Sequence, residues 1–410
     1  MDFLKVESLD SARKKLFDKV GHWFASTEVI SVDDSLNRIA TEDVFTPEDV
    51  PGFRRSTVDG FAVLSGDAAA CGEGIPAFLT LKGQVEIGLP SLFSLISGEC
   101  AEVPTGGMIP DGTDAVVMCE HAEAFGEDGV AISRSVAHGE NVVLPGEDAK
   151  KGTLLLRRGK KIMPQDIGAL AAAGVTSVSV FVPPKVTIIS TGDELVPPKK
   201  TPRLGQVRDV NSYAISALAR KHGFEVLGSS VLPDDEVALE QAIREAMEVS
   251  NIVMVSGGSS KGKGDFTRPV FDRLATPGVF THGIAVKPGK PTILGFDESS
   301  RTLLIGLPGH PVSAMVAFEL LPGWLLREVT GCEPAFAVPA RLASNVAASQ
   351  GKLTCFPCRL IRTGDEYIAQ PVYGKSGLIT TLSNADGYFL IPRNLEGLPE
   401  GQVVMVEMFY

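Results

Sequence analysis

The sequence lacks any apolar run of the ~18 residues that a membrane-spanning helix requires. Its first segment, MDFLKVESLDSARKKLFDKV, spreads charges among the apolar residues. This pattern predicts an amphipathic helix and not the apolar core of a signal peptide. We therefore expect a cytoplasmic protein that has no membrane partner.

Cysteine is scarce, with 6 residues in a chain of 410, which excludes a disulfide-stapled scaffold. Cys355 and Cys358 form a C-x-x-C pair, but no second pair or C-x-x-H partner lies near it in the sequence. A zinc site or a redox role is a weaker interpretation of this pair than two small apolar residues in a β segment.

Positive charge is also in short supply, since Lys and Arg number 38 against 50 Asp and Glu, giving a net charge of −12. This balance disfavours a nucleic-acid partner, which requires a basic face. It does not disfavour an anionic small molecule, because a local pocket can be basic on an acidic protein. Apolar residues at 44% and charged residues at 21% indicate a folded globular chain, and its length predicts two to four domains.

The pattern of apolar residues divides the chain into α/β and β regions. Residues 183–330 alternate strands with helices, which predicts a doubly wound parallel sheet covered on both faces. Residues 46–146 and 331–410 contain short β segments separated by Gly, Pro and Asp, so we expect a small β domain and a C-terminal, barrel-like β domain. Residues 27–45 and 147–182 should form a linker domain into which the small β domain is inserted, and 1–26 a helix packed on the α/β domain.

Four polar, Gly-rich segments follow predicted strands of the α/β region: STGDEL, LPDD, SGGSSKGKGDFT and GLPGHPVS. The carboxyl ends of parallel strands meet at one edge of an open sheet, where ligands bind. A turn role explains any single Asp or Gly equally well, but four loops of one character favour a site. The side chains expected to converge there are Glu194, Asp234, Asp235, Lys261, Lys263, Asp265 and His310.

The chemistry of this edge combines carboxylates with anion-binding groups. Glu194, Asp234 and Asp265, without a His or Cys cluster, suit a hard cation such as Mg²⁺. Glycine-rich turns expose backbone amides to an anion, and Lys287 and Lys290 in AVKPGKP add positive charge. We therefore predict phosphate chemistry or oxyanion binding.

SGGSSKGKGDFT contains most of a P-loop, since Gly257, Gly262 and Lys263 fit G-x4-G-K. The next residue is Gly264, so the Ser or Thr hydroxyl that would hold Mg²⁺ is missing. The segment therefore predicts an anion cradle and not a P-loop NTPase.

Three segments outside the α/β region also concentrate polar residues. They are RRSTVDGFAV with Asp59, VPTGGMIPDGTDAVV with Thr105, and GENVVLPGED with Asp148. Taken alone, each is explained as well by a turn as by a site.

Together these motifs resemble the molybdopterin molybdenumtransferases of the MoeA type, a family that includes the gephyrin E domain. STVDGFAV, VPTGGMIPDGTDAVV, GED, STGDEL, QVRDVNSY, SGGSSKGKGDFT, AVKPGKP and GLPGHPVSA occur in the family's order over nearly the whole chain. The resemblance implies elongated homodimers of four-domain subunits. It also implies an enzyme that loads molybdate onto the dithiolene of adenylylated molybdopterin and releases AMP with the help of Mg²⁺.

The resemblance also implies residue roles. Asp59, Thr105 and Asp148 would act catalytically from the neighbouring subunit, whereas Glu194, Asp234 and Asp265 would act along the crevice and bind the metal. Asp209 and Asn211 have a second interpretation as the cap of the helix that starts there. The residues expected to bind the substrate are Ser190, Thr191, Gly192, Asp209, Asn211, Gly257, Gly258, Ser259, Lys287, Lys290, Pro308, Gly309, His310 and Pro311.

Several positions depart from the family's pattern. Val58 replaces a Met, His310 replaces an Asn, the stretch 258–261 differs, and Val143, Leu144 and Pro145 stand where arginines are common. A paralogue that uses tungstate, the related adenylyltransferase and a non-catalytic scaffold therefore remain alternatives. The adenylyltransferase and the recipient molybdoenzymes or their chaperones are the partners that the resemblance implies.

Overall fold

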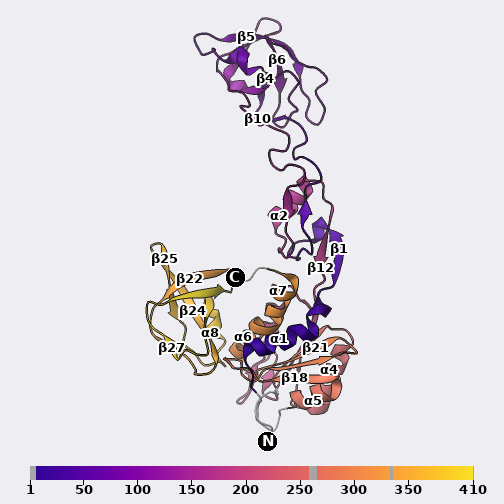
Figure 1. The fold of residues 1–410 in the computed structure, drawn as a ribbon, viewed down its shortest axis with the longest axis vertical. Helices are drawn as coiled ribbons and strands as arrows, with labels where there is room; N and C mark the ends of the chain where they lie inside the picture. The colour runs from indigo at the N-terminus through magenta and orange to yellow at the C-terminus, as the bar shows by residue number, and fades with distance from the viewer. Residues whose placement is uncertain (1–5, 258–265, 333–335, 410) are drawn as a thin grey trace.

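The computed structural model describes residues 6–257, 266–332 and 336–409. The molecule is elongated, with a small β unit at one end and the α/β and C-terminal units together at the other (Figure 1). A narrow linker unit connects the two ends. In the described part of the chain, no helix has the length and apolar character needed to span a membrane.

The distal β unit is built on a mixed six-stranded sheet. Its core is formed by alternate residues of the strands, including Val63, Leu79, Cys100, Val117 and Ile132. A two-stranded ribbon of β3 (Arg55–Ser56) and β10 (Val142–Val143) closes its base. In order across the sheet, the strands are β7 (Ala115–Met118), β4 (Gly60–Val63), β6 (Glu99–Val103), β5 (Ala77–Gln84), β9 (Gly129–Ile132) and β8 (Ala122–Phe125).

The linker unit consists of two antiparallel strand pairs and one helix. Helix α2 (Pro164–Ala172) begins with Pro164 at its first turn, and Gly174 follows its end with a positive φ of 74°, as the sequence predicts. Asp166 accepts a hydrogen bond from the Met163 amide at 2.9 Å and so caps the helix. The pairs are β1 (Thr27–Ser31) with β12 (Ser177–Phe181), and β2 (Val44–Phe45) with β11 (Leu154–Leu156).

The α/β unit contains a six-stranded sheet in the order β16, β13, β17, β21, β20, β18. The first four strands are parallel, and β18 at the edge runs in the same direction. Strand β20 lies between β21 and β18 and is antiparallel to both, so the sheet is mixed and not wholly parallel as expected. The strands are β13 (Lys185–Thr191), β16 (Glu225–Leu232), β17 (Ile252–Ser256), β18 (Pro277–His282), β20 (Ile293–Asp297) and β21 (Thr302–Leu307).

Helices cover both faces of this sheet. One face packs against α1 (Leu9–Val20), α3 (Asn211–His222), α6 (Pro311–Phe318) and α7 (Trp324–Thr330). The other packs against α4 (Glu236–Met247) and α5 (Thr267–Leu274). Helix α1 buries Leu9, Ala12, Leu16 and Val20, which recur at helical spacing and join the α/β core.

The helical segment that follows β21 is interrupted. A π turn, η5 (Glu319–Gly323), separates α6 from α7 and contains Pro322. Proline has no amide hydrogen and its ring clashes with the preceding turn, so a regular α-helix cannot continue through it. The carbonyl of Leu320 instead accepts a hydrogen bond from Nε of Arg13 on α1, at 2.9 Å.

The C-terminal unit is a five-stranded barrel, closed by the pairing of β24 with β26. Its strands are β22 (Ala337–Leu342), β24 (Leu353–Thr363), β25 (Glu366–Pro371), β26 (Gly387–Ile391) and β28 (Val403–Met408). The short strand β19 (Val286–Lys287) of the α/β unit pairs with β24 and so joins the two units. The minor elements of this end are β14 (Leu195–Val196), β15 (Val207–Arg208), β23 (Val346–Ala347), β27 (Gly397–Leu398) and α8 (Thr380–Ser383).

The C-x-x-C pair lies on β24, and both thiols are buried. Cys355 joins the core shared with the α/β unit, whereas Cys358 joins the barrel core. Burial raises the pKa of Cys358 to about 12, so its thiol stays protonated at neutral pH. This environment suits two small apolar residues better than a redox pair.

Candidate functional site

A crevice of about 1290 Å³ opens between the carboxyl ends of the parallel strands and the C-terminal barrel. The α/β unit contributes the loops after β13, β17 and β21, together with the loop before β20. The barrel contributes residues of β24 and of the loop that precedes α8. The crevice therefore lies at the edge of the sheet where an open α/β fold binds ligands.

Most residues singled out in the α/β sequence line this crevice. Asp235 does not, because its carboxylate accepts a hydrogen bond from the Ala238 amide at 2.7 Å and caps α4. Gly258, Ser259, Lys261, Lys263 and Asp265 lie outside the described residues. The lining residues from the sequence analysis are Ser190, Thr191, Gly192, Glu194, Asp209, Asn211, Asp234, Gly257, Lys287, Lys290, Pro308, Gly309, His310 and Pro311.

Three buried polar atoms at the crevice have no hydrogen-bond partner among the described residues: Ser190 Oγ, Thr191 Oγ1 and Asn211 Oδ1. The Asn211 side chain is nevertheless fixed, because its Nδ2 donates to Ser256 Oγ at 2.6 Å and to the Gly309 carbonyl at 2.8 Å. Leaving a buried polar group unsatisfied costs about 1–3 kcal/mol. Three such atoms on one wall are best explained by a ligand that supplies their partners.

Asp209 combines two roles in the structure. Its buried carboxylate accepts hydrogen bonds from the Ser212 amide at 3.2 Å and from the Ser212 hydroxyl. It therefore caps the start of α3, as the second interpretation of the sequence predicts, while it also lines the crevice.

Two backbone features shape the crevice at the ends of the parallel strands: Gly257 and the start of α6. Gly257 has a φ of 106°, and a Cβ at this position would lie 2.3 Å from the Thr191 carbonyl oxygen. Only glycine therefore lets the ends of β13 and β17 approach so closely. Pro311 is the first residue of α6, and no side chain caps this helix. A helix start of this kind favours an anion.

His310 links the two walls of the crevice. Its Nδ1 lies 2.8 Å from the hydroxyl oxygen of Ser376, a residue of the barrel loop. The Val312 amide donates to the Ser376 carbonyl at 3.1 Å. The imidazole thus holds the barrel loop against the start of α6.

Cationic side chains outnumber carboxylates in the lining. Two of them, Lys352 and Lys375, come from the barrel and were missed by the sequence analysis. The Gly- and Ser-rich stretch that surrounds Lys375 was the only available signal. Within the described parts of the chain, the lining contains five cations, Arg208, Lys287, Lys290, Lys352 and Lys375, and three carboxylates, Glu194, Asp209 and Asp234. The crevice therefore suits an anionic ligand although the whole chain is acidic.

Two of the three predicted metal ligands, Glu194 and Asp234, lie in the crevice. Asp193 Oδ1 accepts a hydrogen bond from the Asp234 amide at 3.0 Å, which connects the two loops. Within residues 6–257, 266–332 and 336–409, no group of three or more His, Cys, Asp or Glu side chains could hold a metal ion. Two carboxylates still fit Mg²⁺, which takes one or two from a protein and completes its shell with water and substrate phosphates.

Asp59 and Thr105 form a second polar site on the distal unit. Thr105 donates to Asp59 Oδ1 from its amide at 2.7 Å and from its hydroxyl at 2.9 Å. These hydrogen bonds, the one from the amide first, lower the pKa of Asp59, so an ionised carboxylate is exposed at neutral pH.

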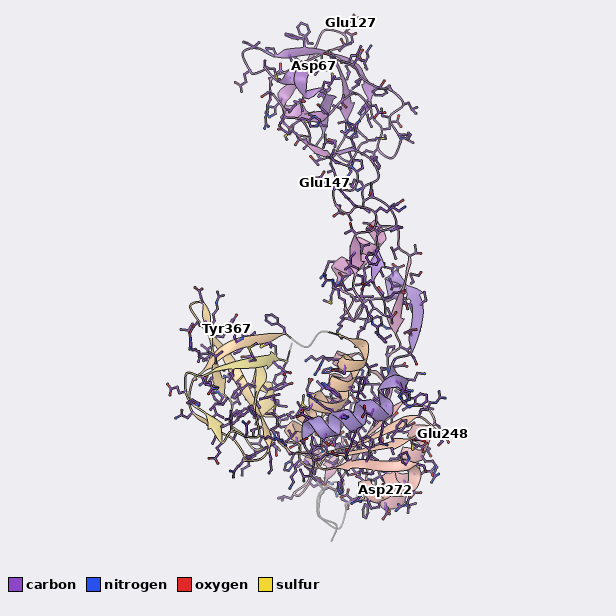
Figure 2. All side chains as sticks on the ribbon, in the orientation of Figure 1. Asp67, Glu127, Glu147, Glu248, Asp272 and Tyr367 are labelled. Atoms are coloured by element: carbon purple, nitrogen blue, oxygen red, sulfur yellow. The ribbon has the colours of Figure 1, made fainter. Side chains whose placement is uncertain are left out.

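Asp148 is also exposed and lies at the neck below the distal unit, next to Glu147 (Figure 2). The distal unit and its neck are remote from the α/β unit of the same chain (Figure 1). One chain therefore does not bring Asp59, Thr105 and Asp148 together with the crevice.

Comparisons with known proteins agree with this architecture. Family models match the MoeA N-terminal region (domains I and II) at residues 7–174, a probable molybdopterin binding domain at 187–327, and the MoeA C-terminal region (domain IV) at 339–409. The molybdopterin molybdenumtransferase of Haemophilus influenzae is 35% identical over 79% of this chain and 78% of its own length. That of Bacillus subtilis is 32% identical over 93% and 89%.

The solved structure of the molybdopterin biosynthesis protein MoeA of Pyrococcus horikoshii has the same overall fold. It superimposes with a TM-score of 0.79 at 30% identity, covering 99% of this chain and all of the other. Sequence, fold and crevice thus agree, and the chain belongs to the MoeA family of molybdopterin molybdenumtransferases.

Proposed function

We propose that this chain is a molybdopterin molybdenumtransferase that works in the cytoplasm, inserts molybdate into adenylylated molybdopterin and releases AMP. The observation that carries the proposal is the crevice wall of Ser190, Thr191 and Asn211, whose buried polar atoms need a ligand. The excess of cations over carboxylates among the described lining residues supports a multiply charged anion. Both the diphosphate of the pterin substrate and molybdate have this character.

The proposed reaction balances without an external oxidant or reductant. Two Mo–S bonds form between molybdate and the dithiol, and one molybdate oxygen leaves as water with the two thiol protons. The phosphoanhydride bond takes up one water, and AMP leaves. Molybdenum keeps its oxidation state throughout, so the residues need to bind and position the two anions and carry no electrons.

The residues of the crevice have separate tasks in this scheme. Lys287, Lys290 and Lys375 bind phosphate or molybdate oxygens, and the uncapped start of α6 adds backbone dipoles. Glu194 and Asp234 would hold Mg²⁺, which when bound neutralises charge on the phosphate oxygens. Fixing both anions side by side lowers the entropic barrier to their reaction.

We further propose that the active form is a homodimer in which the distal unit of one subunit completes the crevice of the other. The remoteness of Asp59 and Asp148 from the crevice of their own chain supports this arrangement. Arg55, which pairs with Val143 across the base of the distal unit, keeps positive charge beside the stretch where the family's arginines are missing. The enzyme that adenylylates molybdopterin and the recipient molybdoenzymes are the partners this activity requires.

The test is AMP release from adenylylated molybdopterin with Mg²⁺, in separate titrations of molybdate and tungstate. We expect release to require molybdate and to fall by about tenfold or more in Lys290→Met, which removes one anion contact. The matched control is Lys199→Met, an exposed lysine of the same unit outside the crevice.

Other outcomes would assign the alternatives. A preference for tungstate would change the metal and keep the mechanism. Bound substrate without AMP release would support the scaffolding role. Formation of adenylylated molybdopterin from molybdopterin and ATP would support the adenylyltransferase, although the distal unit and the barrel have no evident task in that reaction.

A further inference from the structure

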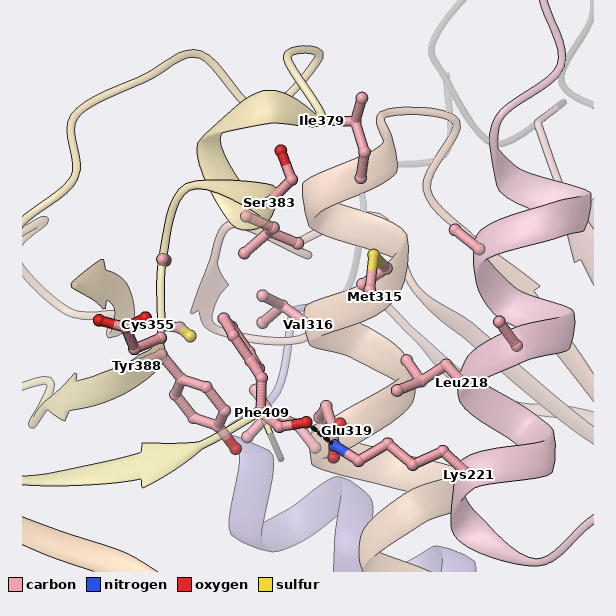
Figure 3. A pocket seen from close by; sticks show the side chains of 16 residues that line it. Leu218, Lys221, Met315, Val316, Glu319, Cys355, Ile379, Ser383, Tyr388 and Phe409 are labelled. Atoms are coloured by element: carbon pink, nitrogen blue, oxygen red, sulfur yellow. Dashed lines mark hydrogen bonds between the residues drawn. The ribbon is translucent and has the colours of Figure 1, made fainter. Parts of the chain in front are cut away.

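A second cavity, of about 600 Å³, lies between α3 and α6 on one side and the barrel with α8 on the other (Figure 3). Its walls are mainly apolar, and the small side chains of Ala214 and Ala217 leave room beside Met315, Val316 and Leu382. Its volume, its apolar lining and its place between two units are typical of sites for small organic ligands. Neither the proposed reaction nor the family matches assign it a task.

One end of the cavity is polar. Lys221 Nζ donates to the carbonyl oxygen of Phe409 at 2.5 Å, and the Glu319 carboxylate lies beside this hydrogen bond (Figure 3). Tyr388 lines the same end, and its hydroxyl donates to Glu407 Oε2 at 2.6 Å. A ligand that fills the apolar part therefore places its polar group at Lys221.

The two carboxylates among the described lining residues, Glu319 and Asp386, already have partners. Asp386 Oδ2 accepts a hydrogen bond from the Leu360 amide at 2.8 Å. The charge of Glu319 is already balanced, since its Oε2 lies 2.9 Å from His222 Nε2 and 3.7 Å from Arg327 Nη1. Burial alone would raise the pKa of Glu319, but the contact with His222 and the nearby cations outweigh it and lower the pKa. Among the described residues, Lys221 donates a hydrogen bond only to a neutral carbonyl, and its charge also lowers the pKa of Glu319. The other N–H donors of its ammonium remain available to an acidic group.

The backbone next to Lys221 is also unusual. Glu319 and Leu320, which line the cavity, lie in the π turn that separates α6 from α7. Turns of this type are rare and occur frequently at functional sites. Pro322 accounts for the break in the helix, and the turn places Glu319 and Leu320 in the lining of the cavity.

We propose that this cavity binds a small organic anion with an apolar, ring-containing body, whose acidic group pairs with Lys221. The ligand's rings would lie among Ala217, Met315 and Leu382, and would brace the α/β unit against the barrel. Cys355 lines both this cavity and the crevice, so the two sites are separated by little more than α6 and β24.

The test uses two fluorescent probes with one ring system, on the full-length protein. 1-Anilinonaphthalene-8-sulfonate carries a sulfonate, and N-phenyl-1-naphthylamine is its neutral counterpart. We expect saturable binding of both by the wild type. Lys221→Met should weaken binding of the sulfonate by about tenfold and leave the neutral probe unchanged, because only the sulfonate uses the charge. Ala217→Trp should abolish binding of both by filling the cavity.

The matched control is Arg220→Met, which removes the preceding exposed cation of α3 and leaves the cavity lining intact. It should bind both probes as the wild type does. Near-ultraviolet circular dichroism of each variant establishes that it is folded.

The proposal is overturned if the wild type binds neither probe, or if Lys221→Met weakens both probes equally. It is also overturned if Ala217→Trp binds as the wild type does. A wild type that binds neither probe, combined with a changed association state of Ala217→Trp in sedimentation, would show that a second protein chain covers the cavity instead. None of these readouts depends on AMP release, so they can fail or succeed independently of the proposed enzyme activity.

Discussion

Asp297 shows how a single buried carboxylate stabilises the antiparallel edge of the α/β sheet. It accepts hydrogen bonds from the amides of Thr276 and Ser300 and from the hydroxyls of Ser299 and Ser300. Burial opposes ionisation, but these four hydrogen bonds, with Ser299 the strongest, outweigh it and lower the pKa to about 2. The ionised carboxylate therefore stabilises the folded state at neutral pH.

We expect Asp297→Asn to lower the free energy of unfolding by about 2 kcal/mol at pH 7, because the amide accepts fewer hydrogen bonds and carries no charge. The folded pKa lies below the unfolded value of about 3.9, so the difference should be complete above about pH 4 and vanish as the pH falls through 2. Urea unfolding across this range measures it. Glu298→Gln, an exposed neighbour, should change little, and a difference that persists below pH 2 would contradict the explanation.

For single residues, the sequence indicated which polar side chains gather near a site, but it did not indicate which of them face the ligand. Asp234 and Asp235 are adjacent and chemically identical, yet only Asp234 lines the crevice, whereas Asp235 caps α4. Lys352 and Lys375 reach the crevice from a unit that has no strand-helix pattern, so no local rule placed them there. Which side chain faces a ligand depends on packing between units, and local spacing does not contain that information.

The absence of a side chain at Gly257 lets the ends of strands β13 and β17 lie close together. It ends β17 with a φ of 106°, and an added Cβ would meet the carbonyl oxygen of Thr191 at the end of β13. We expect Gly257→Ala to lower the free energy of unfolding by roughly 2 kcal/mol, since both the backbone conformation and the contact become strained. It should also weaken substrate binding by moving Thr191.

Thermal unfolding and substrate titration of the variant provide the measurement. Gly228→Ala is the control, because a Cβ at this position of β16 meets nothing within 4 Å and the backbone is unstrained. Equal melting temperatures for the two alanine variants would refute the argument.

The elements themselves were partly predictable. Alternation of apolar strands and amphipathic helices identified the α/β unit, because burial on both faces leaves a regular pattern in the sequence. The antiparallel direction of β20 was missed, since strand direction depends on the connection and not on composition. Pro322 by itself predicts a break in the helix, but the apolar run around it is typical of one continuous helix, so the break was not predicted.

For the whole molecule, the pattern of apolar residues predicted the order of the α/β and β regions, whereas the homodimer came from the resemblance to a family. The structure separates the exposed carboxylates of the distal unit from the lysines of the crevice by the length of the linker unit. A catalytic site that needs both sets must therefore take them from two chains. The domain boundaries and the homodimer remain predictions, and the dimer has a direct test.

Two strongly impaired variants, Asp59→Asn and Lys290→Met, should regain activity when their subunits are mixed. If each site combines the crevice of one subunit with the distal unit of the other, a mixed dimer has one site carrying both defects and one intact site. Random pairing of equal amounts then yields about a quarter of wild-type AMP release, because half of the dimers are mixed and each has one working site of two. Each variant alone, and the two combined without time for subunit exchange, should keep the low activity of the separate variants. If mass spectrometry of tagged subunits shows that mixed dimers form but no AMP is released, both residues act in a site within one chain. The elongated structure would then have to bend to bring them together.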